Sequence, residues 1–233
     1  MLVEMRPDLA PKAVERIRLL ARERLYDGLQ FHRVVAGFVA QTGNPNNKDG
    51  GASSHPDLAP EFTFTLRADA SGQAGSPFKF VTRRSDGFDG LAGATPITGE
   101  TKPAKGPTGV THRGWGAYCT GVAGMGRQAD PGTANSEMFF MLAPERRLDH
   151  EYTVWGRVVV GREVLAALTI GEPPDNPDRM TRVRVAAELP ERERPTVQLE
   201  DGPALQRRID AARRLKGADF SICDVEVAAK VVR

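Results

Sequence analysis

The segment FHRVVAGFVAQ, residues 31–41, decides how this chain is interpreted. Within nine residues it holds a permanent cation, Arg33, an aromatic ring, Phe38, and an amide, Gln41. As a single strand, the segment puts Arg33 and Gln41 on one face and Phe38 on the other, so Gly37 predicts a bulge or bend that re-aims the residues after it. A short motif of this kind is a hypothesis that the rest of the chain has to support.

The composition is typical of a folded protein that is rich in turns. The chain has 233 residues, of which 40% are hydrophobic and 27% charged, enough for one large domain or two small ones with a buried core. Its 24 glycines and 17 prolines favour an all-β fold over a helical bundle. The 32 basic and 30 acidic side chains leave a net charge of +2, so we expect no nucleic-acid partner.

The cysteines and histidines indicate no metal site and no cofactor. Cys119 and Cys223 fit no zinc spacing. Two buried thiols are the favoured interpretation, and a disulfide that ties the C-terminal tail to the main domain is the alternative. We interpret His32 as a structural, hydrogen-bonded residue. No ligand spacing is found among the histidines, which are His32, His55, His112 and His150.

The start of the chain bears on its compartment. No apolar run reaches the ~18 residues of a membrane span, so we expect no membrane insertion. We expect no signal peptide in the sequence as it stands, because residues 1–3 lead directly into a charged segment. Residues 2–5 predict a hairpin strand without its partner strand, so we expect that the natural chain starts upstream or that the tail supplies the strand. The expected compartment is cytoplasmic by default, and periplasmic or secreted if an upstream signal peptide is missing.

Local patterns predict two helices. Pro11 opens the first, which ends before the stop signal at residues 26–28 and carries Arg16 on its outer face. Its inward residues recur at helical spacing: Val14, Ile17, Leu20 and Ala21. Near the C-terminus, residues 204–215 predict a short amphipathic helix and residues 220–227 a strand. The inward residues of this later helix are Leu205, Ile209 and Leu215.

The stretch from residue 44 to residue 114 is rich in Gly and Pro, which predicts loops rather than regular structure. Residues 62–66 and 78–81 are its short strand candidates. Loops of this length are usually functional or mobile. We therefore expect an elaborated rim near a binding groove.

Four later segments extend the pattern of residues 31–41. They are GVAGMGR at 121–127, NSEMFF at 135–140, LD at 148–149 and YTVWGRVVVG at 152–161. In combination they resemble the cyclophilins, a family of peptidyl-prolyl cis/trans isomerases, over roughly residues 2–68 and 114–188. The resemblance implies a mainly all-β fold, a closed antiparallel β-barrel of about eight strands capped by two helices.

The resemblance also divides the chain. It implies a cyclophilin-like isomerase domain at residues 1–188, with a long loop insertion at about 69–113. Within that domain, residues 162–168 match the second helix and residues 183–187 a closing strand. Residues 189–233 are then a C-terminal extension packed on the barrel, and a partner-docking tail is the less favoured alternative.

The implied activity needs no nucleophile and no cofactor. Rotation about a peptide bond passes through a twisted amide with a barrier of ~18–20 kcal/mol, and a catalyst has to bind that twisted form better than either planar form. The resemblance implies catalytic roles for Arg33 as an electrostatic stabiliser, Phe38 in the slot for the proline ring, and Gln41 as a partner of the substrate backbone. It implies substrate-binding roles for Val39, Gly126, Arg127, Met138, Phe140, Leu148 and Tyr152.

Four positions depart from the family pattern. Met138 stands where the family commonly has Gln, and Gly126-Arg127 replaces the common Ala-Asn pair. Arg147 replaces an aromatic residue that binds cyclosporin in family members, so we predict weak cyclosporin binding. The favoured function is isomerisation of proline-containing polypeptides during protein folding, by a monomer. The alternative is a proline-peptide binding module or chaperone with weak or no catalysis.

Overall fold

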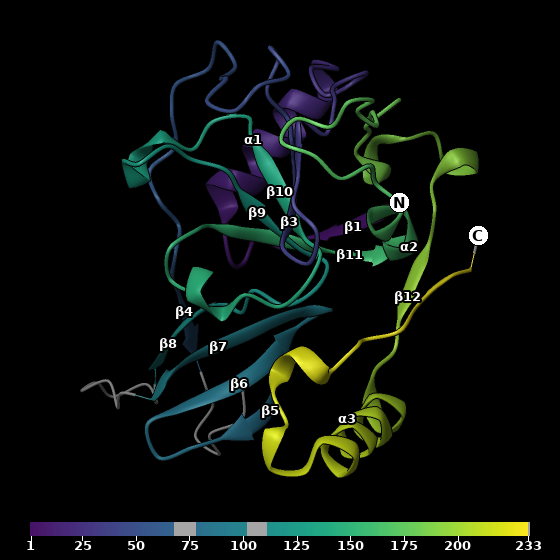
Figure 1. Cartoon of the computed structure of the whole chain (residues 1–233). Coiled ribbons are helices and arrows are strands. Elements are labelled where there is room, and N and C mark those ends of the chain that lie inside the picture. Colours follow the sequence, from purple (N-terminus) through teal and green to yellow (C-terminus); the bar gives the residue numbers. More distant parts are fainter. Residues whose placement is uncertain (68–77, 102–110, 233) are drawn as a thin grey trace.

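The computed structural model describes residues 1–67, 78–101 and 111–232, and its fold is mainly β, with two larger antiparallel sheets (Figure 1). The six-stranded sheet consists, in spatial order, of β1 (Leu2–Met5), β11 (Val154–Val160), β9 (Val122–Met125), β10 (Met138–Met141), β3 (Val39–Thr42) and β2 (Arg33–Val34). The five-stranded sheet consists of β4 (Phe64–Arg67), β8 (Thr111–Gly116), β7 (Thr95–Thr101), β6 (Gly87–Ala92) and β5 (Phe78–Arg83). Closure of these sheets into one barrel stays a prediction.

The remaining regular elements are two main helices and several short pieces. The main helices are α1 (Pro11–Arg22) and α3 (Gly202–Lys216), and α2 (Arg162–Ala166) is a single short turn. A separate two-stranded sheet pairs β12 (Val197–Leu199) with β13 (Ala229–Val231). The 3-10 turns span Pro131–Thr133, Arg146–Leu148, Ala186–Glu188, Glu191–Glu193, Gly217–Asp219 and Ile222–Asp224. No helix in the described part of the chain is long and apolar enough to cross a membrane.

Helix α1 begins at Pro11, as predicted, and a distant carboxylate completes its first turn. The two oxygens of Glu61 accept the backbone N–H groups of Lys12, at 3.0 Å, and Ala13, at 2.8 Å. These donors have no partner inside the helix, and the positive end of the helix dipole attracts the carboxylate. The long connection before β4 is therefore anchored to the start of α1.

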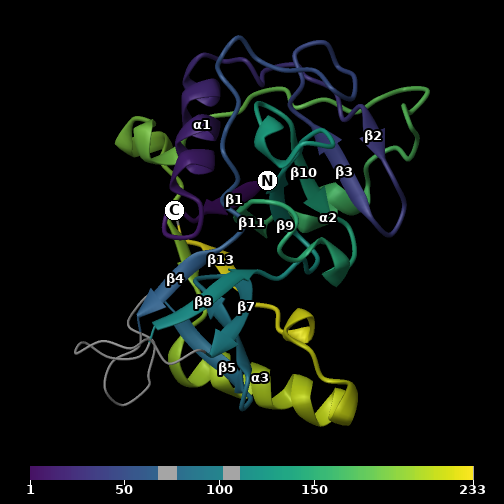
Figure 2. The ribbon, with the colours of Figure 1, turned by 90° about the vertical axis from the view of Figure 1, so that its left-hand side faces the viewer.

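Helix α1 covers one face of the six-stranded sheet and builds the first core of the molecule (Figures 1 and 2). This first core includes Val14, Ile17, Leu20, Ala123, Met138, Phe140 and Trp155. The prediction that Arg16 faces outward is wrong, because it is only 7% exposed. Its guanidinium donates to the backbone carbonyls of Pro56, at 2.7 Å, and Asn135, at 3.3 Å. A buried guanidinium is tolerated where backbone carbonyls accept its donors.

Residues 31–41 form a β-hairpin rather than one bulged strand. Strands β2 and β3 pair antiparallel, and the bend predicted at Gly37 is the turn between them, with φ at +65°. Glycine adopts this left-handed conformation without the penalty that other side chains carry. The turn is closed by the N–H of Val35, which donates to the carbonyl of Val39 at 2.9 Å.

The predicted loop insertion is largely a β-sheet, so the prediction of loops is wrong, while its strand candidate at residues 78–81 is confirmed within β5. Strands β5, β6, β7 and β8 follow one another as antiparallel neighbours, and β4 pairs with β8. The frequent glycines of this region predicted loops, but Gly99 and Gly114 lie within strands. At both positions a neighbouring aromatic ring occupies the space that a side chain would fill. A Cβ on Gly99 would lie 2.5 Å from the ring of Phe88. The rest of the predicted insertion, residues 69–77 and 102–110, lies outside the described residues.

The C-terminal segment packs against the five-stranded sheet through α3 (Figure 2). A disulfide joins Cys119 to Cys223 across 104 positions of sequence, so the favoured prediction of two free thiols is wrong and its alternative is confirmed. Residues from both larger sheets and this segment together form a second core. The second core includes Val39, Leu91, Tyr118, Cys119, Phe139, Met141, Leu205, Ile209 and Ile222.

Several predicted element boundaries are wrong. Leu215 is 82% exposed, because the inward stripe of α3 ends at Ile209. Residues 220–227 were predicted as a strand but contain the 3-10 turn Ile222–Asp224. Residues 183–187 were also predicted as a strand but lead into the 3-10 turn that begins at Ala186. The strand predicted at residues 2–5 is confirmed as β1, which pairs with β11, whereas the strands of the tail pair with each other.

Candidate functional site

A pocket opens where the hairpin β2–β3 meets strand β10 and the chain after β9. Ten residues line it: Arg33, Phe38, Val39, Gln41, Gly126, Arg127, Glu137, Phe139, Leu148 and Tyr152. Eight of them were predicted as site residues, and their roles in binding or catalysis stay predictions. The pocket has one polar side, around Arg33, and one aromatic side, around Tyr152.

The hairpin explains why Arg33 and Gln41 meet. They are directly opposite each other in the β2–β3 register, and facing residues of an antiparallel pair share one side of the sheet. The guanidinium Nη1 of Arg33 donates to Gln41 Oε1. Alternation within a single strand could not predict this contact, because the chain reverses between the two residues.

Strand β10 presents the opposite set of residues from the set that was predicted. Phe139 lies across from Gln41 and, with Glu137, lines the pocket. Met138 and Phe140 belong to the first core and are 3% and 2% exposed. The prediction that these two line the pocket is therefore wrong, because a shift of one residue moves a side chain to the other face of a strand. The period of two along this strand is the signal that could have found Glu137 and Phe139.

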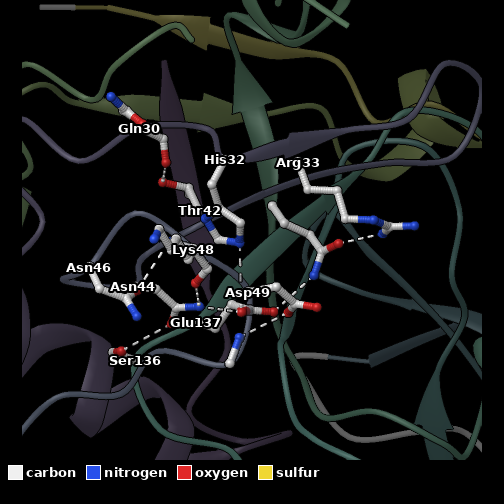
Figure 3. A network of polar contacts seen from close by, with 12 residues as sticks. Gln30, His32, Arg33, Thr42, Asn44, Asn46, Lys48, Asp49, Ser136 and Glu137 are labelled. Carbon is white, nitrogen blue, oxygen red and sulfur yellow. Dashed lines mark hydrogen bonds and ion pairs between the residues drawn. The ribbon is translucent and has the colours of Figure 1, made fainter. Parts of the chain in front are cut away.

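Glu137 holds the polar side of the pocket together (Figure 3). Its Oε1 accepts the amide of Gln41 at 2.8 Å, and its Oε2 accepts the amide of Asn44. Burial raises the pKa of the Glu137 carboxyl above its ordinary value, although the Asn44 hydrogen bond opposes this. Gly126 makes room for the carboxylate, since a Cβ there would lie 2.2 Å from Oε1.

His32 lies behind this network, with Nε2 at 3.7 Å from Glu137 Oε2. Burial lowers the pKa of His32, as expected for a group whose charged form loses its hydration. Neither ring nitrogen forms a hydrogen bond with any residue that the structure describes. The prediction that His32 is a hydrogen-bonded structural residue is therefore wrong within that part of the chain.

Aromatic rings form the opposite wall. Phe139 stacks on Tyr118 at 5.7 Å and meets Tyr152 edge-on at 5.6 Å, between ring centroids. The guanidinium of Arg127 lies 4.3 Å from the ring centroid of Tyr152 and donates to the backbone carbonyl of Glu151 at 3.0 and 3.1 Å. Arg127 therefore reinforces the aromatic wall.

Arg33 has a second partner outside the pocket. Its Nε donates to Glu172 Oε2 at 2.6 Å, and the carboxylate is 54% exposed. The described residues supply no acceptor for Nη2. Two neighbours thus accept hydrogen bonds from Nε and Nη1 of Arg33, while Nη2 can donate to a ligand.

A mainly antiparallel β fold that holds an Arg–Gln pair beside an aromatic pocket agrees with the resemblance to the cyclophilins. Over residues 1–186 the chain matches the family described as cyclophilin type peptidyl-prolyl cis-trans isomerase/CLD, and it belongs to this family.

Relatives and solved structures agree with that assignment. The chain is 29% identical over 202 residues to a protein named "Probable peptidyl-prolyl cis-trans isomerase" from Brucella suis, which covers 80% of this chain and 77% of the relative. It is 29% identical over 164 residues to the peptidyl-prolyl cis-trans isomerase ppi1 of Schizosaccharomyces pombe, covering 70% and 74%. The crystal structure of cyclophilin AquaCyp293 from Hirschia baltica matches with a TM-score of 0.83 and 28% identity, over 98% of this chain and 85% of that one.

Proposed function

We propose that this protein catalyses cis/trans rotation about X-Pro bonds of polypeptides and so assists protein folding. The observation that carries the proposal is the Arg33 guanidinium, which donates to Gln41 and Glu172 and lines an aromatic pocket. The peptidyl-prolyl isomerase names of the relatives support the same reaction. No residue of the proposed site has to act as a nucleophile.

The reaction needs stabilisation of a twisted amide. Rotation removes amide resonance, against a barrier of ~18–20 kcal/mol, and leaves a localised lone pair on the proline nitrogen. A permanent cation that donates towards that nitrogen, or towards the displaced carbonyl oxygen, favours the twisted form over both planar forms. Arg33 supplies the donor, and Phe139, with Phe38 beside it, supplies the apolar slot for the proline ring.

Glu137 acts as a positioning residue in this proposal. It accepts the N–H of the Gln41 amide, which turns the amide oxygen towards Arg33. The amide orientation of Gln41 is thus fixed by a partner on each side. The buried carboxylate therefore sets the direction of Gln41, and Gln41 in turn holds the guanidinium.

A proline-peptide binding module with little catalysis is the second candidate. The Arg33–Glu172 ion pair favours it, because a bound carboxylate competes with the substrate for the guanidinium. The aromatic wall can hold a proline ring in either case. The two functions predict different effects on turnover when the Arg33 guanidinium is removed.

The deciding experiment follows cis-to-trans conversion of an Ala-Pro peptide at low temperature. We expect Arg33→Ala to lower kcat/KM by about 100-fold, the range for loss of one preorganised donor, while peptide binding is retained. Arg207→Ala is the matched control, since Arg207 is exposed on α3. Binding without turnover in the wild type would favour the binding module. Unchanged turnover and binding in Arg33→Ala would remove Arg33 from the site.

A further inference from the structure

Behind the pocket, His32 is a buried histidine without a hydrogen bond. Its side chain is 2% exposed, and neither Nδ1 nor Nε2 has a hydrogen-bonding partner in the part of the chain that the structure describes. Buried polar side chains are nearly always paired with protein, water or an ion, so each exception needs an explanation. The residues around the ring supply one.

Two carboxylates converge on this imidazole (Figure 3). His32, Asp49 and Glu137 each offer one ligand atom, and these atoms all lie within 4.8 Å of one another. Bonds of about 2.0–2.2 Å at tetrahedral angles put two zinc ligands about 3.4 Å apart. The observed 3.7 Å between His32 Nε2 and Glu137 Oε2 is close to that separation. No Lys or Arg forms an ion pair with Asp49 or Glu137 within the described ranges.

We propose that His32, Asp49 and Glu137 bind one divalent transition-metal ion of the Zn²⁺ class. One imidazole and two carboxylates are a donor set that suits such ions. Asp49 is exposed, so an ion reaches the site from solvent. The loop that carries Asp49 is held by a hydrogen bond from the side-chain amide of Asn44 to the backbone carbonyl of Lys48, at 2.7 Å.

The metal site shares Glu137 with the pocket. Oε1 of this carboxylate accepts from Gln41, while Oε2 accepts from Asn44 and faces His32 with its other lone pair. A cation bound on the Oε2 side therefore fixes the carboxylate that orients Gln41. Metal binding itself does not rest on the proposed catalysis, since Arg33 is not among the ligands. The ligands come from three separate segments, so linear spacing of the histidines could not reveal them.

Calorimetry on the full chain tests this proposal. The oxidised protein is treated with a chelator, dialysed and titrated with ZnCl₂ at neutral pH, and Co²⁺ absorption in the visible range reports on coordination. Both cysteines form the disulfide, so no free thiol competes for the ion. The variants are Asp49→Asn and His32→Gln. His55→Gln is the control, because His55 forms an exposed pair with Glu23 at 3.0 Å.

We expect one equivalent of Zn²⁺ to bind the wild type and His55→Gln equally. Asp49→Asn and His32→Gln lower the affinity by about tenfold or more, as loss of a group supporting a metal site typically does. Asp49 is exposed on a loop, so its variant keeps the test valid if His32→Gln does not fold. Absence of saturable binding by the wild type overturns the proposal, and so does equal binding by Asp49→Asn. Loss of binding only in His55→Gln also overturns it.

Discussion

The first and second cores of the molecule are assembled in different ways. The first core joins α1 to one face of the six-stranded sheet, within the range that matches the family. The second core lies between segments of both larger sheets and is completed by α3 and the turn at Ile222. The aromatic wall of the pocket belongs to the second core, through Phe139 and Tyr152. The aromatic wall therefore shares a core with a part of the chain that lies beyond the family match.

The largest expected effect comes from breaking the cross-link of the second core. Cys223→Ser opens a loop closed over 104 positions, and a disulfide that closes about 100 residues contributes about 4.7 kcal/mol in the chain-entropy description. We expect the free energy of unfolding to fall by about 2–5 kcal/mol in urea denaturation. Reductant should destabilise the wild type to the same extent and leave the variant unchanged. Equal stability of variant and oxidised wild type would mean that packing alone holds the second core.

A change on the polar side of the pocket should affect activity more than stability. Gly126→Ala puts a Cβ 2.2 Å from Glu137 Oε1, so the carboxylate, and with it Gln41, has to move. Displacing a positioned group by about 1 Å can cost about 100-fold in rate, and we expect a 10- to 100-fold loss of kcat/KM in the peptide assay.

Gly132→Ala is the matched control for this substitution. A Cβ at Gly132 meets only Asp130 Oδ1, at 3.4 Å, which is ordinary contact. We expect its kcat/KM to equal that of the wild type. An active Gly126→Ala enzyme would show that the Glu137–Gln41 contact does not position Arg33.

The sequence predicted the parts of the site that lie within one short segment. Arg33, Phe38 and Gln41 lie in one hairpin and line the pocket. Because they lie within one short segment, the family resemblance of that segment was enough to predict all three. On β10 the prediction is wrong by one residue, because Phe140 was predicted to line the pocket and Phe139 lines it. Phe139 and Phe140 differ only in the face they occupy, and pairing with β3 and β9 decides that face.

Long-range contacts account for the other failures. Gly-rich segments such as Gly87–Ala92 were predicted as loops, because the neighbouring strands and rings that fill their surface are not visible in the local pattern. The pairing of Cys119 with Cys223 depends on a fold that brings distant segments to a Cα separation of 5.0 Å. Arg16 was placed outside because local periodicity does not show which carbonyls approach from other segments.

A smaller effect on activity is expected from the Arg33–Glu172 ion pair, which joins a residue of the pocket to a residue outside it. Glu172→Gln removes the charge that holds Arg33 Nε, and exposed ion pairs are worth about 0.2–1 kcal/mol. We expect kcat/KM to rise by at most about fivefold, the equivalent of 1 kcal/mol, because the guanidinium no longer has to leave a carboxylate. Glu163→Gln, at an exposed position of α2, should leave the rate unchanged. A fall in activity would instead show that Glu172 orients the guanidinium.

The smallest effect is expected at the rim turn Arg146–Leu148, whose inner side carries Leu148 of the pocket and whose outer side carries Arg147. The hydrogen bond from the Arg147 guanidinium lowers the pKa of Glu145 to about 2. A lowered carboxyl pKa contributes stability that is present above the ordinary value and lost as the pH falls towards 2.

Arg147→Ala should raise the pKa of Glu145 towards its ordinary value, as followed by NMR titration of the side-chain carboxyl, while the backbone N–H of residue 147 still lowers it. The stability difference between variant and wild type should then shrink as the pH falls towards 2 and vanish below it, where the Glu145 carboxyl is protonated in both proteins. Arg146→Ala is the control, because Arg146 pairs with Asp149 at 2.6 Å and should leave Glu145 unchanged. Unaltered turnover in Arg147→Ala would place the outer side of the turn outside the pocket, whereas a changed KM would extend the pocket to Arg147.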